Sequence, residues 1–273
     1  MLPDGRDFLV TFPADAWTYA TFRHAPDRCD VRVHPPSKLK AQRVAAAALE
    51  VLGQRGGGEL HLVSELPEGK GMASSSADLV ATARAVAAAF GIRFDESTLE
   101  ALLRRIEPSD GVMYEGIVAF YHREVRVREV LGTLPPLAII GHDEGGQVDT
   151  IRHNRVPKPF THADKLEYAR LLDEISRAVA ESDVAAVGRV ATRSAEMNLK
   201  LRPRRGFGEL HRACSEVDGL GLVLAHSGTV LGVLLREEDP DLYAKAEHIR
   251  SRCAALDGHI VEHRSLSGDR LEV

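Results

Sequence analysis

Short runs of alternating apolar and polar residues predict strands in the first quarter of the chain. DFLVTF (7–12) and AWTYATF (16–22) are rich in β-branched and aromatic residues, and Pro13 separates them. CDVRVH (29–34) and GELHLVSEL (58–66) show the same alternation. Because successive side chains of a strand point to opposite faces, this pattern is typical of strands with one buried face.

Apolar residues three and four positions apart predict helices between and after these strands. LKAQRVAAAALEVLG (39–53) and the alanine-rich ADLVATARAVAAAFG (77–91) both end in glycine, which commonly closes a helix. DESTLEALLRRI (95–106) begins with aspartate, a good N-cap residue. The small side chains of segment 77–91 predict tight packing against a sheet.

The rest of the chain mixes strands and helices without a regular order. We expect three strands, at 116–121, 123–130 and 136–142, followed by a mostly helical region at 162–218. Two apolar strands joined by a Ser-Gly turn are expected at 221–235, a helix at 239–256 and a last strand at 258–266. Without regular βαβ alternation, this mixture predicts an α+β fold. The change from strand-rich to helix-rich sequence near residue 155 predicts two parts, 1–155 and 156–273.

Composition and charge exclude several kinds of protein. The 273 residues are 44% hydrophobic and 27% charged, with a net charge of −5, which indicates a globular protein and argues against a nucleic-acid-binding surface. No apolar run reaches the ~20 residues of a membrane span, and the N-terminus lacks a signal-peptide core. Three distant cysteines without metal-ligand spacing predict buried free thiols. We therefore expect a cytoplasmic protein with no nucleic-acid or membrane partner.

One loop carries the clearest chemical signal. LPEGKGMASSSADL (66–79) places glycine, alanine and serine between a predicted strand and a predicted helix. Small residues let backbone N–H groups converge on an anion, and the positive end of the helix dipole strengthens the attraction. The P-loop, the GxGxxG dinucleotide motif after a strand and the hydrolase GxSxG motif are all absent. From loop chemistry alone, phosphate binding and a plain helix cap with tight helix–sheet packing both remain open.

The full string PEGKGMASSSA resembles the second motif of the GHMP small-molecule kinases, approximately P-x-x-x-G-L-G-S-S-A. Pro67, Gly71, Ser74 and Ser75 match this motif, whereas Met and Ala replace its Leu and Gly at positions 72 and 73. IEPSDG (106–111) and GLVLAHSGTVLGVLL (221–235) are similar to segments of one branch of that family, the L-threonine kinases of cobalamin biosynthesis. The segments occur in the family's order and at comparable spacing, so the resemblance covers nearly the whole chain.

The resemblance implies a site for ATP and magnesium. In the family this loop wraps the ATP phosphates, so the expected nucleotide-binding residues are Gly69, Lys70, Gly71, Met72, Ala73, Ser74, Ser75 and Ser76. Ser75 and Glu107 are the expected magnesium ligands, and Mg²⁺ prefers such oxygen ligands and keeps several waters. The alternatives are a helix cap for each serine, a solvated side chain for Lys70 and a structural hydrogen bond for Glu107.

The resemblance also implies an acceptor side. Asp110 matches the aspartate that many GHMP kinases place beside the acceptor hydroxyl, where a carboxylate can orient the alcohol and accept its proton. The alternative for Asp110 is a turn or a helix cap. The third motif is expected to shape the site near the acceptor through Ser227, Gly228 and Thr229, unless it forms only a hairpin turn. Further candidates for contacting a zwitterionic substrate, which the sequence does not rank, are Asp78, Asp149 and Arg152.

The chain departs from the family at its N-terminus. The family's first motif, a Pro- and Gly-containing segment that ends in an acidic residue, is missing, and LPDGRDFLVTF corresponds to the family segment that comes after this motif. Either the true start lies upstream, or the protein lacks this element of the family's substrate side.

The expected fold is the two-part GHMP kinase architecture, with the phosphate-binding loop in the N-terminal part and a ferredoxin-like sheet in the C-terminal part. The expected function is ATP- and magnesium-dependent phosphorylation of L-threonine to O-phospho-L-threonine. One alternative is a kinase for another small alcohol or amino acid, such as homoserine or a specialised-metabolism substrate. Another is a catalytically silent nucleotide-binding regulatory protein. The sequence does not indicate an oligomeric state.

Overall fold

The computed structural model describes residues 1–148 and 156–266. Its first sheet has the order β2-β4-β3, with strands β2 (Thr18–Ala25), β4 (Gly57–Ser64) and β3 (Val31–His34). Strand β4 is antiparallel to β2 and parallel to β3. In β3, Val31 and Val33 are buried while the residues after each are exposed, so the predicted alternation gives the sheet one buried face.

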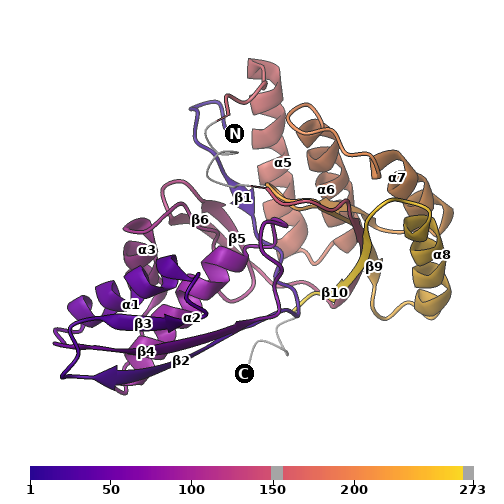
Figure 1. Ribbon diagram of the computed structural model, residues 1–273. Helices are drawn as coiled ribbons and strands as arrows, with labels where there is room; N and C mark the ends of the chain where they lie inside the picture. The colour runs from indigo at the N-terminus through magenta and orange to yellow at the C-terminus, as the bar shows by residue number, and fades with distance from the viewer. Residues whose placement is uncertain (149–155, 267–273) are drawn as a thin grey trace.

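Helices α1 (Leu39–Val51) and α2 (Ser74–Ala88) lie along this sheet at one end of the molecule (Figure 1). The fully buried Ala83 and Ala87 bring α2 close to its neighbours α1 and β2, as the small side chains predict. Helix α3 (Glu96–Arg104) joins the same core. The Asp95 side chain accepts a hydrogen bond from the Thr98 N–H, so the predicted cap is confirmed.

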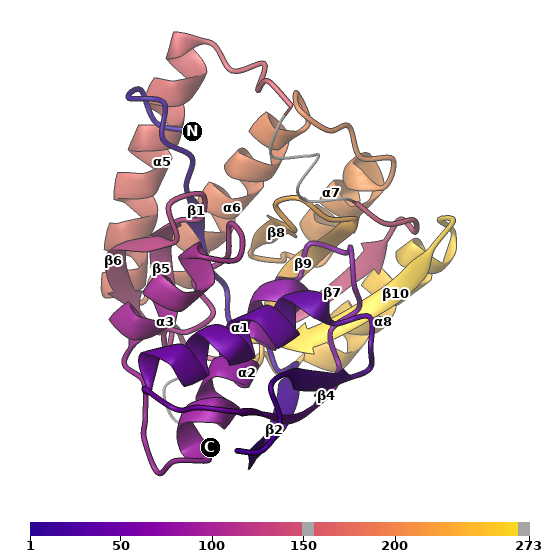
Figure 2. The same ribbon diagram turned by 60° about the vertical axis from the view of Figure 1, so that its left-hand side comes forward.

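A second sheet lies beside the first helical layer. It has the antiparallel order β1-β5-β6, with strands β1 (Leu9–Val10), β5 (Ile117–Tyr121) and β6 (Arg126–Gly132). All of β5 is buried, because Val118 and Phe120 join the core under α1–α3 while Ala119 and Tyr121 join a second core under α5 (His162–Ala180). Figure 2 shows α5 standing against β6.

The third sheet is fully antiparallel, with the order β10-β7-β9-β8. Its strands are β10 (His259–Arg264), β7 (Leu137–Asp143), β9 (Val230–Arg236) and β8 (Gly221–Leu224). Helices α6 (Val184–Asn198), α7 (Phe207–Glu216) and α8 (Leu242–Ala254) pack on it. Strand β7 precedes residue 155, yet strand pairing groups it with the C-terminal strands. The predicted α+β fold is confirmed by this mixture of packed sheets and helices.

Two details differ from the sequence predictions. Helix α2 begins at Ser74 and not at residue 77, so the serines form its first turn. The three cysteines are free, as predicted, but Cys29 is exposed whereas Cys214 and Cys253 are buried. Within the described ranges, every helix is too short or too polar to cross a membrane.

Candidate active site

The loop that joins β4 to α2, residues 65–73, ends in a conformation that leaves the N-terminus of α2 without a side-chain cap. Ala73 has a left-handed backbone with φ of 57° and cannot cap α2 with its methyl side chain. The first backbone bond of the helix runs from Ala77 N–H to the Ala73 carbonyl. Among the residues that the structure describes, no acceptor takes the N–H groups of Ser74, Ser75 and Ser76. The serines therefore do not cap the helix, and their amides are available to an anion.

Ser75 and Glu107 meet at this helix end. The Ser75 hydroxyl donates a hydrogen bond to Glu107 Oε1, and Lys40 Nζ lies 2.6 Å from Glu107 Oε2. Glu107 follows α3, so the packing of α3 against α2 brings the two predicted metal ligands together. A hydroxyl and a carboxylate are hard oxygen donors, so they fit a magnesium ion that takes its remaining ligands from water and phosphate.

Asp110 lies beside the same turn. Its N–H donates to Ser76 Oγ at 2.9 Å, and the Ser109 N–H donates to the His122 carbonyl at 3.0 Å, which fixes this segment between α2 and the end of β5. The half-buried Asp110 carboxylate makes no hydrogen bond to the described residues, so it does not cap a turn or a helix there. Burial, and then the Glu107 charge, raise the pKa of Asp110 to about 6. A carboxylate with this pKa can hold a negative charge near neutral pH and still accept a proton.

Lys70 is not a solvated side chain. Its ammonium lies 2.6 Å from Asp143 Oδ2 at the end of β7, and it donates to the Gly146 carbonyl at 2.8 Å. Gly71 also faces the C-terminal sheet, because a Cβ on Gly71 would lie 2.3 Å from the Gly228 nitrogen. The loop between β4 and α2 therefore meets the segment between β8 and β9 backbone to backbone.

Residues 225–229 connect β8 to β9, and Ala225 N–H donates to the Val230 carbonyl at 3.0 Å. The predicted turn is therefore present, and it also forms one wall of the site. Ser227 and Thr229 are both buried. The Thr229 hydroxyl donates to Asp143, whereas Arg202 approaches the Ser227 carbonyl at 3.4 Å.

Two lysines near the site were not predicted from the sequence. Lys38 lies 2.6 Å from Asp78 and 2.5 Å from Glu68, and Lys40 pairs with Glu107 as described. Both lysines lie at the N-terminus of α1, where a positive charge opposes the helix dipole. In HPPSKLK (34–40), two lysines stand at the start of a predicted helix, where a positive charge is unfavourable, and this placement could have identified them as functional residues.

Asp78, one of the unranked candidates for contacting a zwitterionic substrate, is paired with Lys38. The Asp78 carboxylate is buried and also accepts from the Thr18 hydroxyl at 3.2 Å. Asp149 and Arg152 lie outside the described residues.

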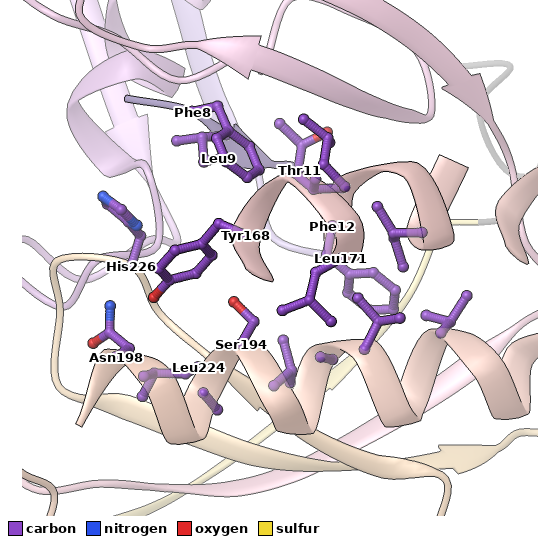
Figure 3. A pocket seen from close by; sticks show the side chains of 18 of the residues that line it. Phe8, Leu9, Thr11, Phe12, Tyr168, Leu171, Ser194, Asn198, Leu224 and His226 are labelled. Carbon is purple, nitrogen blue, oxygen red and sulfur yellow. The ribbon is translucent and has the colours of Figure 1, made fainter. Parts of the chain in front are cut away.

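An apolar cavity of about 190 Å³ lies between the chain around β1 and helices α5 and α6 (Figure 3). Tyr168, Asn198 and His226 line its polar end. Asn198 is 9% exposed, and its Oδ1 has no hydrogen-bond partner among the described residues. The ring of His226 packs edge-on against the ring of His122, with centroids 5.2 Å apart. Because the His122 carbonyl accepts a hydrogen bond from the Ser109 N–H, the polar end of the cavity lies close to the segment that carries Asp110.

Comparison with known proteins identifies relatives of this chain. Residues 40–121 match the family described as GHMP kinases N terminal domain. An L-threonine kinase from Salmonella typhimurium (strain LT2) is 30% identical over 241 residues, which are 87% of this chain and 79% of that protein. An L-threonine kinase from Citrobacter freundii is 30% identical over 180 residues, which are 66% of this chain and 62% of that protein.

Solved structures show the same fold at lower identity. A homoserine kinase from Cytophaga hutchinsonii is 17% identical with a TM-score of 0.74, and the match covers 96% of both chains. The L. major mevalonate kinase in complex with R-mevalonate is 13% identical with a TM-score of 0.72, and the match covers 97% of this chain and 91% of that one.

Proposed function

The chain belongs to the GHMP kinase family and is an ATP-dependent kinase that acts on an alcohol, and on this premise we propose that it phosphorylates the side-chain hydroxyl of L-threonine. The observation that carries the proposed chemistry is the hydrogen bond from Asp110 N–H to Ser76 Oγ. It places a carboxylate with a raised pKa beside the open N-terminus of α2. The choice of threonine is supported by the two L-threonine kinases that align with this chain.

We assign the triphosphate to the loop of residues 69–76. The free amides of Ser74, Ser75 and Ser76 would donate to phosphate oxygens, and the dipole of α2 favours the negative charge there. Ser75 and Glu107 would hold magnesium, which supplies charge neutralisation at the phosphates. Lys40 adds a positive charge beside Glu107.

The chemical step then falls to Asp110. Its carboxylate takes the proton of the acceptor hydroxyl as the oxygen forms a bond to the γ-phosphorus. The bond between that phosphorus and the bridging oxygen breaks, and ADP leaves with the electron pair. The pKa of about 6 keeps Asp110 ionised at neutral pH, so it is ready to accept this proton.

Homoserine is the second candidate acceptor, because a homoserine kinase is among the matching folds. Homoserine and threonine are both hydroxy amino acids of the same size, and they differ in the position of the hydroxyl group. The site chemistry described above serves either alcohol. With threonine as the acceptor, the product would be O-phospho-L-threonine, whose use in cobalamin synthesis stays a prediction from the sequence. The cytoplasmic location of the protein also stays a prediction.

The test is a substrate panel with the purified protein, ATP and Mg²⁺. L-threonine, L-homoserine, L-serine and mevalonate are compared by kcat/KM, and the phosphorylated product is identified by mass spectrometry. We expect L-threonine to exceed each of the others at least about tenfold, which corresponds to ~1.4 kcal/mol of discrimination. A higher kcat/KM for L-homoserine than for L-threonine would make homoserine the proposed acceptor. Absence of product with every alcohol, alongside normal ATP binding, would favour the catalytically silent alternative.

A further inference from the structure

Lys70 and Asp143 form a buried ion pair between the nucleotide loop and the C-terminal sheet. Their side chains are only 15% and 7% exposed, and Lys70 Nζ lies 2.6 Å from Asp143 Oδ2. Lys70 belongs to the loop before α2, whereas Asp143 is the last residue of β7. The ion pair therefore joins two segments that are far apart in the sequence.

Further contacts fix the same junction. The Thr229 N–H donates to the Lys70 carbonyl at 3.1 Å, and the Thr229 hydroxyl donates to Asp143. On the other side, the Val148 N–H donates to the Gly69 carbonyl at 2.9 Å. A Cβ on Gly228 would lie 1.5 Å from the Lys70 carbonyl oxygen, so this approach requires glycine. The residues just before the open amides of α2 are thus held from two sides.

The electrostatics indicate that the Lys70 charge is already compensated. Burial by itself raises the pKa of Asp143, but hydrogen bonds from Lys70, Thr229 and Gly145 outweigh it and leave the pKa below its usual value. An ammonium group has three N–H donors, and Asp143 and Gly146 accept two of those of Lys70. Removing one partner of such a pair leaves the other charge buried and uncompensated, which is costly.

We propose that Lys70 and Asp143 are positioning residues, which act on the nucleotide by holding the Gly69–Lys70–Gly71 backbone against β7 and the 225–229 segment. Lys70 is then not a phosphate ligand, although it lies in the middle of the nucleotide loop. This inference rests on the proposed nucleotide site, because it states how that site is held in shape.

The experiment compares Lys70→Met, Asp143→Asn and the double variant. Asn keeps an oxygen for Thr229 and Gly145 but removes the charge that faces Lys70. We expect both single variants to raise the Kd for MgATP by similar factors of at least about tenfold, and the double variant to be no worse than the weaker-binding single variant.

A second readout needs no nucleotide. If the pair holds the loop, hydrogen exchange speeds up in both single variants at the two amides that donate to the loop, Thr229 N–H to the Lys70 carbonyl and Val148 N–H to the Gly69 carbonyl, while exchange in the core of α1 stays unchanged. We call the exchange of these two amides the loop exchange. The matched control is the Lys245–Asp239 pair, which is 2.8 Å long and has side chains 20% and 19% exposed, but lies at the start of α8. Lys245→Met and Asp239→Asn are expected to leave both the Kd and the loop exchange unaltered.

Three results would overturn the inference. A raised Kd in Lys70→Met with a Kd within about twofold of the parent in Asp143→Asn would identify Lys70 as a phosphate ligand. Additive effects in the double variant, or unchanged loop exchange in both single variants, would show that the pair does not position the loop. If the parent protein binds no MgATP, the proposed function fails, whereas the exchange measurement still decides whether the ion pair holds the loop.

Discussion

The nucleotide side and the cavity beside it are built in opposite ways. Around the N-terminus of α2 the polar side chains have defined partners, because Ser75 bonds to Glu107, Ser76 to Asp110 and Lys70 to Asp143. These contacts surround backbone amides that have no acceptor among the described residues and stay available to an anion. The cavity under β1 is lined mainly by apolar side chains, and the buried Asn198 Oδ1 has no partner in the described part of the chain.

Under the proposed function, the kinase has two different recognition tasks. A triphosphate can be held by backbone amides and a helix dipole, so the nucleotide side depends on backbone conformation and small residues. An acceptor must be distinguished from similar molecules, which requires particular side chains in a pocket. Under the proposed function, we therefore expect the nucleotide side to be alike among related kinases and the surroundings of the acceptor to differ among them.

The largest expected effect on nucleotide binding is that of a methyl group on Gly71. Gly71 has φ of +77°, and a Cβ there would lie 2.3 Å from the Gly228 nitrogen, so alanine must move the loop away from the 225–229 segment. We expect Gly71→Ala to raise the Kd for MgATP more than about 100-fold, because the amides lose their alignment. Isothermal titration calorimetry measures this change.

Gly91→Ala is the matched control for that variant. Gly91 has a similar φ of +67°, but a Cβ on Gly91 would have no atom of the described residues within 4 Å. Gly91→Ala should therefore lower the free energy of unfolding by about 1–2 kcal/mol, through backbone strain alone, and leave the Kd for MgATP unchanged. Equal Kd values for the two alanine variants would mean that the Gly71–Gly228 contact does not shape the nucleotide site.

The next effect separates chemistry from nucleotide binding. Asp110→Asn keeps the shape of the side chain and removes its charge, so kcat should fall by roughly 10²–10⁴ while the Kd for MgATP barely changes. Asp95→Asn is the control, because Asp95 caps α3 and asparagine is an equally good cap. A kcat within about threefold of the parent for Asp110→Asn is too small for a general base on that scale.

The pH dependence of kcat/KM sharpens the same assignment. Asp110 acts as a base only when it is deprotonated, and its pKa is raised to about 6. With threonine as the acceptor, kcat/KM should be level above about pH 7 and fall about tenfold for each pH unit below 6. The profile of Asp110→Asn gives the baseline, because ionisation of the nucleotide remains in both proteins. A decline that begins only near the ordinary aspartate pKa of 3.8 would contradict the role of Asp110.

The sequence predicted the α+β fold, and it placed most strands and helices within a few residues. Periodicity located α1 and α3 because their apolar stripes and caps are local features. It misplaced the start of α2, because the left-handed backbone of Ala73, after which the helix begins, leaves no mark in the spacing of apolar residues. The two lysines and the cavity were missed because their partners are distant in the sequence: Lys40 pairs with Glu107, and Asn198 comes to line the same cavity as the chain around β1, only after folding.

The smallest expected effect concerns the cavity and tests the other half of the comparison. Asn198 lies at the end of α6 with its Oδ1 buried and without a partner among the described residues, so the folded protein bears the desolvation cost of this acceptor. Leucine has a similar size and no polar atom, and Asn198→Leu should raise the free energy of unfolding by about 1 kcal/mol in urea titrations. Ser194→Ala, one helical turn earlier on the same cavity wall, should stay within about 0.5 kcal/mol of the parent. The Kd for MgATP should not change in either variant, because neither residue contacts the loop of residues 69–76. Reduced stability in Asn198→Leu would show that the amide has a binding partner in solution, and that the cavity is as fully organised by polar contacts as the nucleotide side.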